Sequence, residues 1–264
     1  MNDGARDLSG RSLMAVFAHP DDESLAAGGL LAWCASRGAR VSLLCLSRGE
    51  AGSGSEGVDL GATRARELDA AGATLGLSEI VLRGHADGML PWLPDGVLEQ
   101  DIRSTIIERR PEVVVTFGED GLYWHPDHIA VCRATRAAIA SLGDEAPALF
   151  YVTMPPGQMR RVLDAVASRL PAGARHDLLG IDAPDAFGHG AEPPTLVLRV
   201  GHHAARKLAA LRCHRTQVAG GPFDHLEPAE AESLLGVEHY RRAGVGSPAP
   251  AFIERLTGPI LETA

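Results

Sequence analysis

The stretch Leu13-Met14-Ala15-Val16-Phe17-Ala18 is a continuous apolar run of strand length, and the polar cluster His19-Pro20-Asp21-Asp22-Glu23 follows it directly. Leu and Ala then dominate residues 23–36, which predicts a helix that ends before Gly38, and a second apolar run occupies residues 41–46. This order predicts a β-α-β unit. Neither strand alternates between apolar and polar residues, which is typical of a parallel sheet covered on both faces.

The same alternation continues along the chain. Helices are predicted over residues 63–75, 95–110, 125–142, 157–170 and 203–215, and strands over residues 79–82, 113–117, 149–153 and 195–200. This pattern predicts an α/β fold with a doubly wound, mostly parallel, Rossmann-like sheet flanked by helices. We expect residues 1–264 to form a single domain in which residues 222–264 are a C-terminal appendage. Residues 182–194, rich in Gly and Pro, are expected to form a polar loop.

The composition is that of an ordinary globular chain, with 45% hydrophobic and 22% charged residues. The net charge of −9 argues against a nucleic-acid binder. No apolar run reaches the roughly 18 residues of a membrane-spanning helix, and Met1–Arg11 lacks the apolar region of a signal peptide. Four widely spaced cysteines in apolar stretches predict free, buried thiols in a reduced, cytoplasmic protein; they are Cys34, Cys45, Cys132 and Cys213.

The first polar cluster lies where the first strand ends, which is the end of an open parallel sheet that binds ligands. An imidazole and a carboxylate suit a divalent cation such as zinc, so His19 and Asp22 are candidate metal ligands. Asp21 would then stay unligated and act as a base on a water molecule. The alternative is that Asp21 and Asp22 only cap the following helix, which explains one aspartate but not the whole cluster. Glu23 fits a structural role as well as a catalytic one.

A second cluster, His125-Pro126-Asp127-His128, follows the predicted strand at residues 113–117. Pro126 suits the first turn of a helix, so the two histidines, three residues apart, would project to a similar side. One imidazole can bind a metal while the other donates a proton, and Asp127 can orient or tune an imidazole. The two clusters together predict metal-assisted hydrolysis of an acyl–amine bond.

Both clusters resemble the motifs of the LmbE-like/PIG-L family of zinc-dependent N-acetylglucosaminyl deacetylases, which includes the deacetylases of mycothiol and bacillithiol biosynthesis. The resemblance covers about residues 12–218, with supporting matches at Ser47–Gly52, Arg64–Leu68, Asp87–Met89 and Lys207–Gln217. It implies an LmbE-like fold. It also implies removal of acetyl from the 2-acetamido group of an N-acetylglucosaminyl conjugate, with acetate and a free amine as products.

The resemblance further implies roles for single residues. The implied metal ligands are His19, Asp22 and His128. Asp21 would be the general base, and a cationic His125, tuned by Asp127, the general acid or oxyanion stabiliser. The residues that match sugar contacts of the family are Arg64, Asp87, Tyr123 and, more weakly, Glu50. The implied cofactor is Zn²⁺, which Fe²⁺ can replace in a site of two histidines and one aspartate.

Several alternatives remain open at this point. Arg64 can instead form an ion pair on a helix face, Tyr123 can be a packing residue, and His214 can be either a structural residue or a neighbour of the site. His189 and its loop can shape the rim of the pocket.

A second enzymatic hypothesis is a metalloamidase for a non-sugar amide, such as a thiol conjugate or a lipidated natural product. A third is a sugar- or nucleotide-binding module, but a binder needs no acid–base pair, and no GxGxxG follows the first strand. The expected partner is a small glycoconjugate substrate, with no nucleic acid and no membrane. The sequence leaves open whether the chain forms a homo-oligomer.

Overall fold

The computed structural model describes residues 7–52 and 59–256. Two expectations fall partly outside these ranges. Residues 1–6 of the segment that lacks a signal-peptide pattern are not described, and neither are residues 257–264 of the C-terminal tail.

Strands and helices alternate as the sequence predicts. The strands are β1 (Ser12–Phe17), β2 (Arg40–Ser47), β3 (Glu79–His85), β4 (Val113–Phe117), β5 (Ala148–Thr153), β6 (Leu196–Arg199) and β7 (Val237–Gly246). The longer helices are α1 (Asp22–Ser36), α2 (Leu60–Leu75), α3 (Val97–Arg109), α5 (Pro126–Ala140), α6 (Gln158–Val166), α7 (Gly201–Cys213) and α10 (Pro228–Leu235). Short turns of helix are α4 (Gly121–Trp124), α8 (Arg215–Val218), α9 (Pro222–His225), η1 (Leu90–Trp92), η2 (Gly143–Glu145), η3 (Pro184–Ala186) and η4 (Phe252–Arg255).

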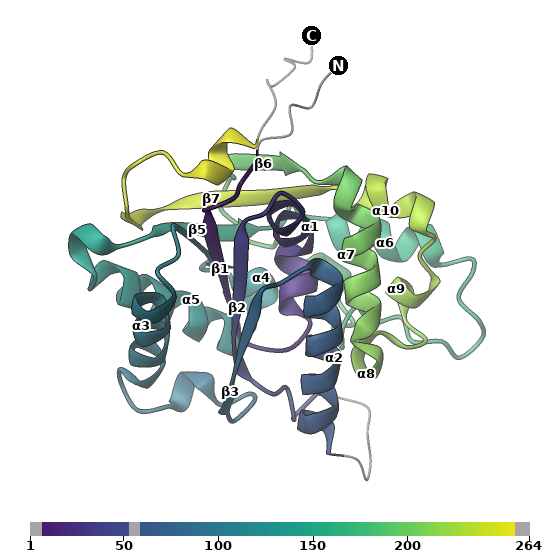
Figure 1. Cartoon of the computed structure of the whole chain (residues 1–264). Helices are drawn as coiled ribbons and strands as arrows, with labels where there is room; N and C mark the ends of the chain where they lie inside the picture. The colour runs from purple at the N-terminus through teal and green to yellow at the C-terminus, as the bar shows by residue number, and fades with distance from the viewer. Residues whose placement is uncertain (1–6, 53–58, 257–264) are drawn as a thin grey trace.

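The described strands form one seven-stranded sheet in the order β3-β2-β1-β4-β5-β7-β6. The first five strands pair in parallel, whereas β7 runs antiparallel to both β5 and β6. Helices cover both faces, with α3 and α5 on one side and α1, α2 and α7 on the other (Figure 1). The predicted doubly wound, mostly parallel α/β fold is therefore confirmed. All six residues of β1 are buried, which explains its unbroken apolar sequence.

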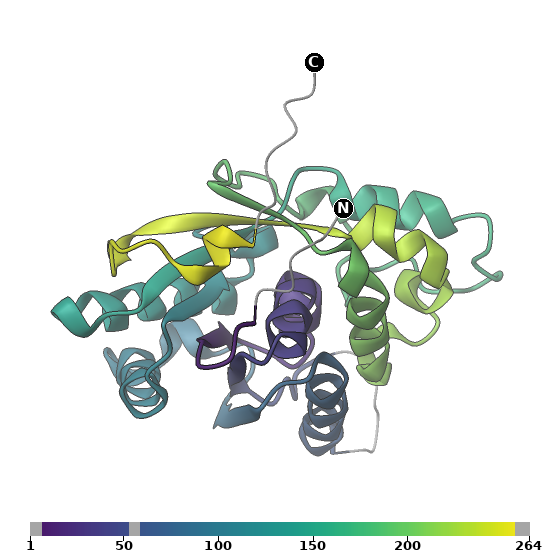
Figure 2. The same cartoon turned by 45° about the horizontal axis from the view of Figure 1, so that its top comes forward.

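The C-terminal tail contributes to the sheet itself, because β7 lies between β5 and β6 (Figure 2). The sequence analysis assigned no strand to residues 222–264 and described them as an appendage. The sequence of β7, VEHYRRAGVG, contains several charged residues and no apolar run, so its pattern does not predict a strand. Glu238 is nonetheless 4% exposed, and a strand of this composition is recognised only when its buried polar partners are known.

Two expectations about membranes and thiols can be compared with the structure. No helix within the described residues is long and apolar enough to cross a membrane. All four cysteines are free; Cys34, Cys45 and Cys132 are buried as expected, while Cys213 is partly exposed.

Candidate active site

The predicted site residues gather at the carboxyl edge of the sheet. His19 follows β1, Glu50 follows β2, Asp87 follows β3, and the second histidine cluster follows β4 and opens α5. Parallel strands place their carboxyl ends side by side, so segments more than a hundred residues apart meet there. The ring of His19 lies 5.1 Å from that of His128, centroid to centroid.

Three side chains offer donor atoms to a common point. His19 Nδ1 lies 3.2 Å from His128 Nε2. Asp22 faces both rings, with Oδ2 3.4 Å from His19 Nδ1 and Oδ1 3.3 Å from His128 Nε2. Ligands about 2.0–2.1 Å from a tetrahedral zinc ion lie ~3.3 Å apart, so these donors fit such an ion. Asp22 faces the two rings through different oxygens, whereas two other groups bring single donor atoms within 4.8 Å of one another: His19 with His125 and His128, and His19 with Asp87 and Asp127.

The remaining ring nitrogens of the two histidines fix their orientation. His19 Nε2 lies 3.1 Å from Asp127 Oδ2 and 3.0 Å from Asp87 Oδ1. His128 Nδ1 lies 3.1 Å from the Gly121 carbonyl oxygen. An imidazole that donates one N–H to a carboxylate or carbonyl leaves its other nitrogen free to bind a metal, which is the usual arrangement behind metal-ligating histidines.

The electrostatics of the cluster suit a cation. Burial favours the neutral form of His128, and with the neighbouring histidines it lowers the pKa of His128 to about 3 despite the Asp22 carboxylate. Burial disfavours the charged form of His19 as well, but hydrogen bonds to Asp127, Asp22 and Asp87 raise its pKa well above the ordinary value. The pKa of Asp22 is lowered because His128 and His19 outweigh the cost of burial. A metal ion would replace the proton that His19 carries.

This exchange leads to a testable prediction for zinc binding. We expect the wild type to bind a single equivalent of Zn²⁺ in equilibrium dialysis, to release a proton on binding, and to lose affinity as the pH falls because His19 becomes protonated. His19→Ala should abolish this binding, while His202→Ala, at an exposed position of α7, should leave it unchanged. Equal zinc content in His19→Ala and wild type would rule out His19 as a ligand.

Asp21 lies beside these donors in a strained conformation. Its φ is 115°, a left-handed value that non-glycine residues rarely adopt and that costs about 1–3 kcal/mol. Its side chain does not cap α1, and the Asp22 carboxylate accepts from the His19 N–H rather than from α1, so the cap-only interpretation is wrong. Instead, Asp21 Oδ2 accepts from Arg64 Nη2 at 3.0 Å. Burial raises the pKa of Asp21 to about 7, although Arg64 opposes the shift.

The Arg64 guanidinium is buried and holds the loops around Asp21. It donates to the Pro20 carbonyl at 2.6 Å and to the Gly49 carbonyl at 2.8 Å. Gly49 has a φ of 67°, and a Cβ there would come within 2.4 Å of the guanidinium, so any other residue would strain the turn and displace Arg64. Arg64 is thus not on an exposed helix face. Its guanidinium is hydrogen-bonded to protein groups around the site.

A buried pair behind Asp21 supports its backbone. The Asp21 N–H donates to Glu23 Oε2 at 3.0 Å, and Glu23 Oε1 lies 2.8 Å from His214 Nε2. Glu23 and His214 are both 0% exposed. The sequence leaves the roles of both residues open, because their separation along the chain gives no signal of the contact. The structure places His214 behind the site, where its contact with Glu23 steadies the strained turn.

His125 and Asp127 do not pair as expected. The Asp127 carboxylate accepts from the backbone N–H groups of Gly88 and Leu90 and contacts His19, whereas His125 Nδ1 accepts from the Asp127 backbone N–H at 3.2 Å. An accepting Nδ1 places the imidazole proton on Nε2. Burial and the nearby His19 lower the pKa of His125, and the Asp127 charge only partly opposes this. The lowered pKa favours a neutral imidazole with its proton on Nε2. The role of a cationic His125 as general acid or oxyanion stabiliser stays a prediction.

Tyr123 lies in an irregular segment braced by the loop at residues 182–194. The Gly188 N–H donates to the Leu122 carbonyl at 2.8 Å, and the buried Phe187 ring lies 4.8 Å from that of Tyr123. Tyr123 in turn packs against His128 at 5.1 Å between ring centroids. The loop thus helps to form the wall of the site.

Asp87 and Glu50 contact protein groups rather than only open space. Asp87 Oδ2 accepts from the Ala51 N–H at 2.9 Å while Oδ1 faces His19. Glu50 is exposed, and its Oε1 accepts from the Asp87 N–H at 3.0 Å. Both carboxylates therefore join the loops after β2 and β3. The ring of Phe117 stacks on that of His128 at 3.9 Å between centroids. This contact was not expected, because no sequence pattern distinguishes Phe117 from a core residue.

The chain is similar in sequence to known deacetylases. The family described as PIG-L: GlcNAc-PI de-N-acetylase matches residues 14–139. A 1D-myo-inositol 2-acetamido-2-deoxy-alpha-D-glucopyranoside deacetylase from Acidothermus cellulolyticus is 32% identical to this chain, over 87% of the chain and 88% of the relative. An enzyme of the same name from Thermomonospora curvata is 34% identical, over 87% and 89%. The chain belongs to the PIG-L family.

Solved structures agree on the fold of this PIG-L family member. An N,N'-diacetylchitobiose deacetylase from Pyrococcus horikoshii superposes with a TM-score of 0.63 at 17% identity, covering 88% of this chain and 83% of that one. The 4-carboxy-2-hydroxymuconate hydratase GalB from Pseudomonas putida KT2440 matches with a TM-score of 0.61 at 17% identity, covering 91% and 99%. Because a hydratase shares the fold, the reaction must be argued from the site.

Proposed function

We propose that this protein is a zinc-dependent deacetylase that removes the acetyl group from the 2-acetamido group of an N-acetylglucosaminyl conjugate. The observation that carries the proposal is the pairing of a buried donor set, His19, Asp22 and His128, with an unligated, strained carboxylate, Asp21, beside it. The names of the relatives, which act on an acetamido sugar linked to inositol, support the substrate class. Iron(II) suits the same donors, so the metal in the cell is part of the test.

In the proposed reaction, the residues of the site have separate roles. A divalent cation held by the donor set would polarise the acetyl carbonyl and make a water molecule more acidic. Asp21, with its pKa raised to about 7, accepts a proton from the attacking water and can return it to the departing amine. The Nε2–H of His125 donates to the oxygen that gains negative charge. Arg64 keeps Asp21 oriented, and Tyr123 with Phe187 closes the wall of the site.

The proposed place of action is the cytoplasm. The wide spacing of the four cysteines along the sequence, with three of the thiols buried, supports this proposal.

The decisive experiment measures acetate release from a panel of N-acetylglucosaminyl conjugates by protein reconstituted with Zn²⁺ or Fe²⁺. We expect release from at least one inositol- or sugar-linked conjugate and none from the metal-free protein. Metal binding without release from any sugar conjugate would contradict the sugar assignment and favour a non-sugar amide as the substrate.

The pH dependence of kcat/KM should report Asp21. The base works only when ionised, so activity falls as the pH drops through its pKa; the metal-free value is about 7, and a bound cation lowers it. Arg64→Gln removes the positive charge that lowers this pKa, so the acidic limb should move to higher pH. Arg66→Gln, at an exposed position two residues further along α2, should not move it. An unshifted limb in Arg64→Gln would mean that Asp21 is not the titrating base.

A further inference from the structure

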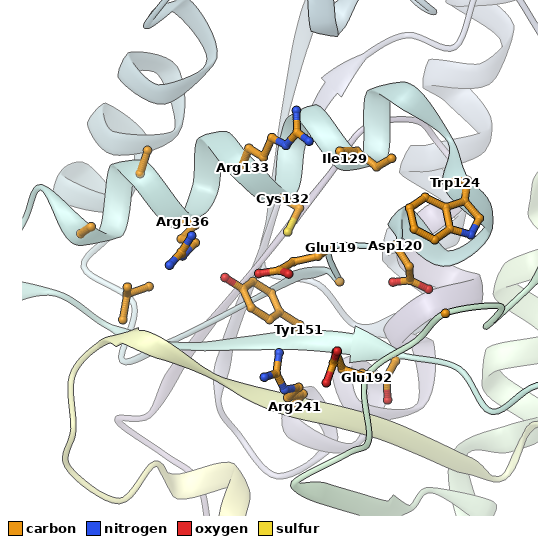
Figure 3. Close-up of a pocket in the computed structure, with 16 residues that line it drawn as sticks. Glu119, Asp120, Trp124, Ile129, Cys132, Arg133, Arg136, Tyr151, Glu192 and Arg241 are labelled. Atoms are coloured by element: carbon orange, nitrogen blue, oxygen red, sulfur yellow. The ribbon is translucent and has the colours of Figure 1, made fainter.

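A cavity of about 740 Å³ lies between α5 and strands β5 and β7. Its walls are formed by side chains of α5, of strands β5 and β7, and of the loop around Gly190 (Figure 3). None of the candidate metal ligands, nor Asp21 or His125, lines it. The volume falls within the range of about 300–1,000 Å³ that small-molecule sites occupy.

Two buried polar atoms from its walls have no hydrogen-bond partner within the described part of the chain. They are the Tyr151 hydroxyl, from a residue that is 3% exposed, and Asp120 Oδ2, from a residue that is 5% exposed. A buried polar group left without a partner costs about 1–3 kcal/mol. Burial, with Cys132 nearby, raises the pKa of Tyr151 to about 12, so the phenol keeps a proton that it can donate. Each of the two atoms can form a hydrogen bond with a polar ligand atom in the cavity.

Basic and acidic side chains both line the cavity, and Figure 3 shows Glu119 near Tyr151 and Glu192 near Arg241. Tyr151 on β5 and Arg241 on β7 are register partners. Their side chains point toward α5, and the side chain of Arg136 on α5 points toward them (Figure 3). Among the described residues, neither arginine forms an ion pair. Unpaired guanidinium groups beside a phenol O–H can bind a phosphate or carboxylate, because each guanidinium supplies N–H donors in a fixed fork.

Acidic and aromatic groups complete the lining. The carboxylates belong to Glu119, Asp120 and Glu192, and they can accept hydrogen bonds from hydroxyl groups. Trp124 lies at one end of the cavity (Figure 3), with its N–H donating to the His189 carbonyl at 2.9 Å. It has a φ of 65°, unfavourable for a non-glycine residue, and is 54% exposed. An indole face held this way suits stacking against a sugar ring.

We propose that this cavity is a second ligand site, separate from the metal site, for a sugar that carries a phosphate or carboxylate. The anionic group would lie between Arg136, Arg241 and the Tyr151 hydroxyl. The sugar hydroxyls would donate to the carboxylates, and the ring would rest on Trp124. The proposal does not rest on the deacetylase activity, because it concerns residues that the catalytic reaction does not use.

Isothermal titration with glucose 6-phosphate tests the site, with glucose and inorganic phosphate as the two partial probes. We expect glucose 6-phosphate to bind more tightly than either partial probe. Arg136→Ala and Arg241→Ala should each weaken this binding by about tenfold or more, the loss expected for one charge-assisted contact. Glucuronate, run in parallel, distinguishes a carboxylate from a phosphate preference.

Two control variants make the outcome specific. Arg206→Ala removes an exposed arginine on α7, away from the cavity, and should bind like wild type. Arg64→Gln alters the catalytic site and should also leave binding unchanged. The proposal is overturned if wild type binds neither anionic sugar, or if inorganic phosphate binds as tightly as glucose 6-phosphate. It is equally overturned if Arg64→Gln abolishes binding while Arg136→Ala does not, since the sugar would then occupy the catalytic site.

Discussion

Asp21→Asn should retain a full equivalent of zinc yet lose about 10²- to 10⁴-fold in kcat, the range that general acid–base catalysis contributes. The reason is geometric: the Asp21 carboxylate contacts Arg64 rather than the two histidines, so the metal donors stay intact without it. An amide retains an oxygen that can accept from Arg64, which keeps the loop in place. The same protein preparation should therefore be assayed for bound zinc, thermal stability and acetate release.

The matched control is Asp69→Asn, because Asp69 is an exposed aspartate on α2. It makes the same chemical change far from the metal donors and should leave kcat within about twofold of wild type, as surface substitutions usually have small effects. If Asp21→Asn keeps most of its turnover, another group must accept the proton. If it loses its zinc instead, Asp21 is a ligand, and the proposed division between ligand and base is wrong.

The sequence predicts the centre of the site better than its surroundings. The sequence predicts that His19, Asp22 and His128 lie together, because they follow buried strands in two short clusters and parallel strands bring such clusters together. The structure places these three side chains in contact. The orientation of Asp127 toward His19 was not predictable, because this contact joins residues 108 positions apart in the sequence. The support of Asp21 by Glu23 and His214 depends on a contact across 191 residues.

The same limit applies to the fold. Strands β1 and β4 are recognisable because every residue in them is buried and apolar or small. Strand β7 is not, because its interior carries Glu238, whose burial is tolerated only through partners on other elements. The local sequence pattern therefore identifies a strand whose residues are all apolar or small. A strand that carries a buried charged residue can be recognised only when its partners on other elements are known.

Buried hydrogen bonds of Glu238 connect the C-terminal tail to the rest of the fold. Its carboxylate accepts from Lys207 Nζ at 2.6 Å, from the Tyr240 hydroxyl at 2.7 Å, and from the backbone N–H groups of Gly29 and Leu30 at 2.8 and 2.9 Å. Lys207 is 2% exposed. A buried ion pair is only weak evidence for net stabilisation, but removing one partner leaves a charge without compensation.

Lys207→Met should therefore destabilise the protein by about 3–5 kcal/mol, measured as the free energy of unfolding in urea. For a chain of this size we expect the melting temperature to fall by roughly 10 °C. The double variant Lys207→Met/Glu238→Gln removes both charges, so it should lose less stability than the sum of the two single variants. Arg160→Met, which breaks the exposed Arg160–Asp185 pair, should cost less than about 1 kcal/mol. Additive losses in the double variant would show that packing, rather than the uncompensated charge, fixes β7 to α1 and α7.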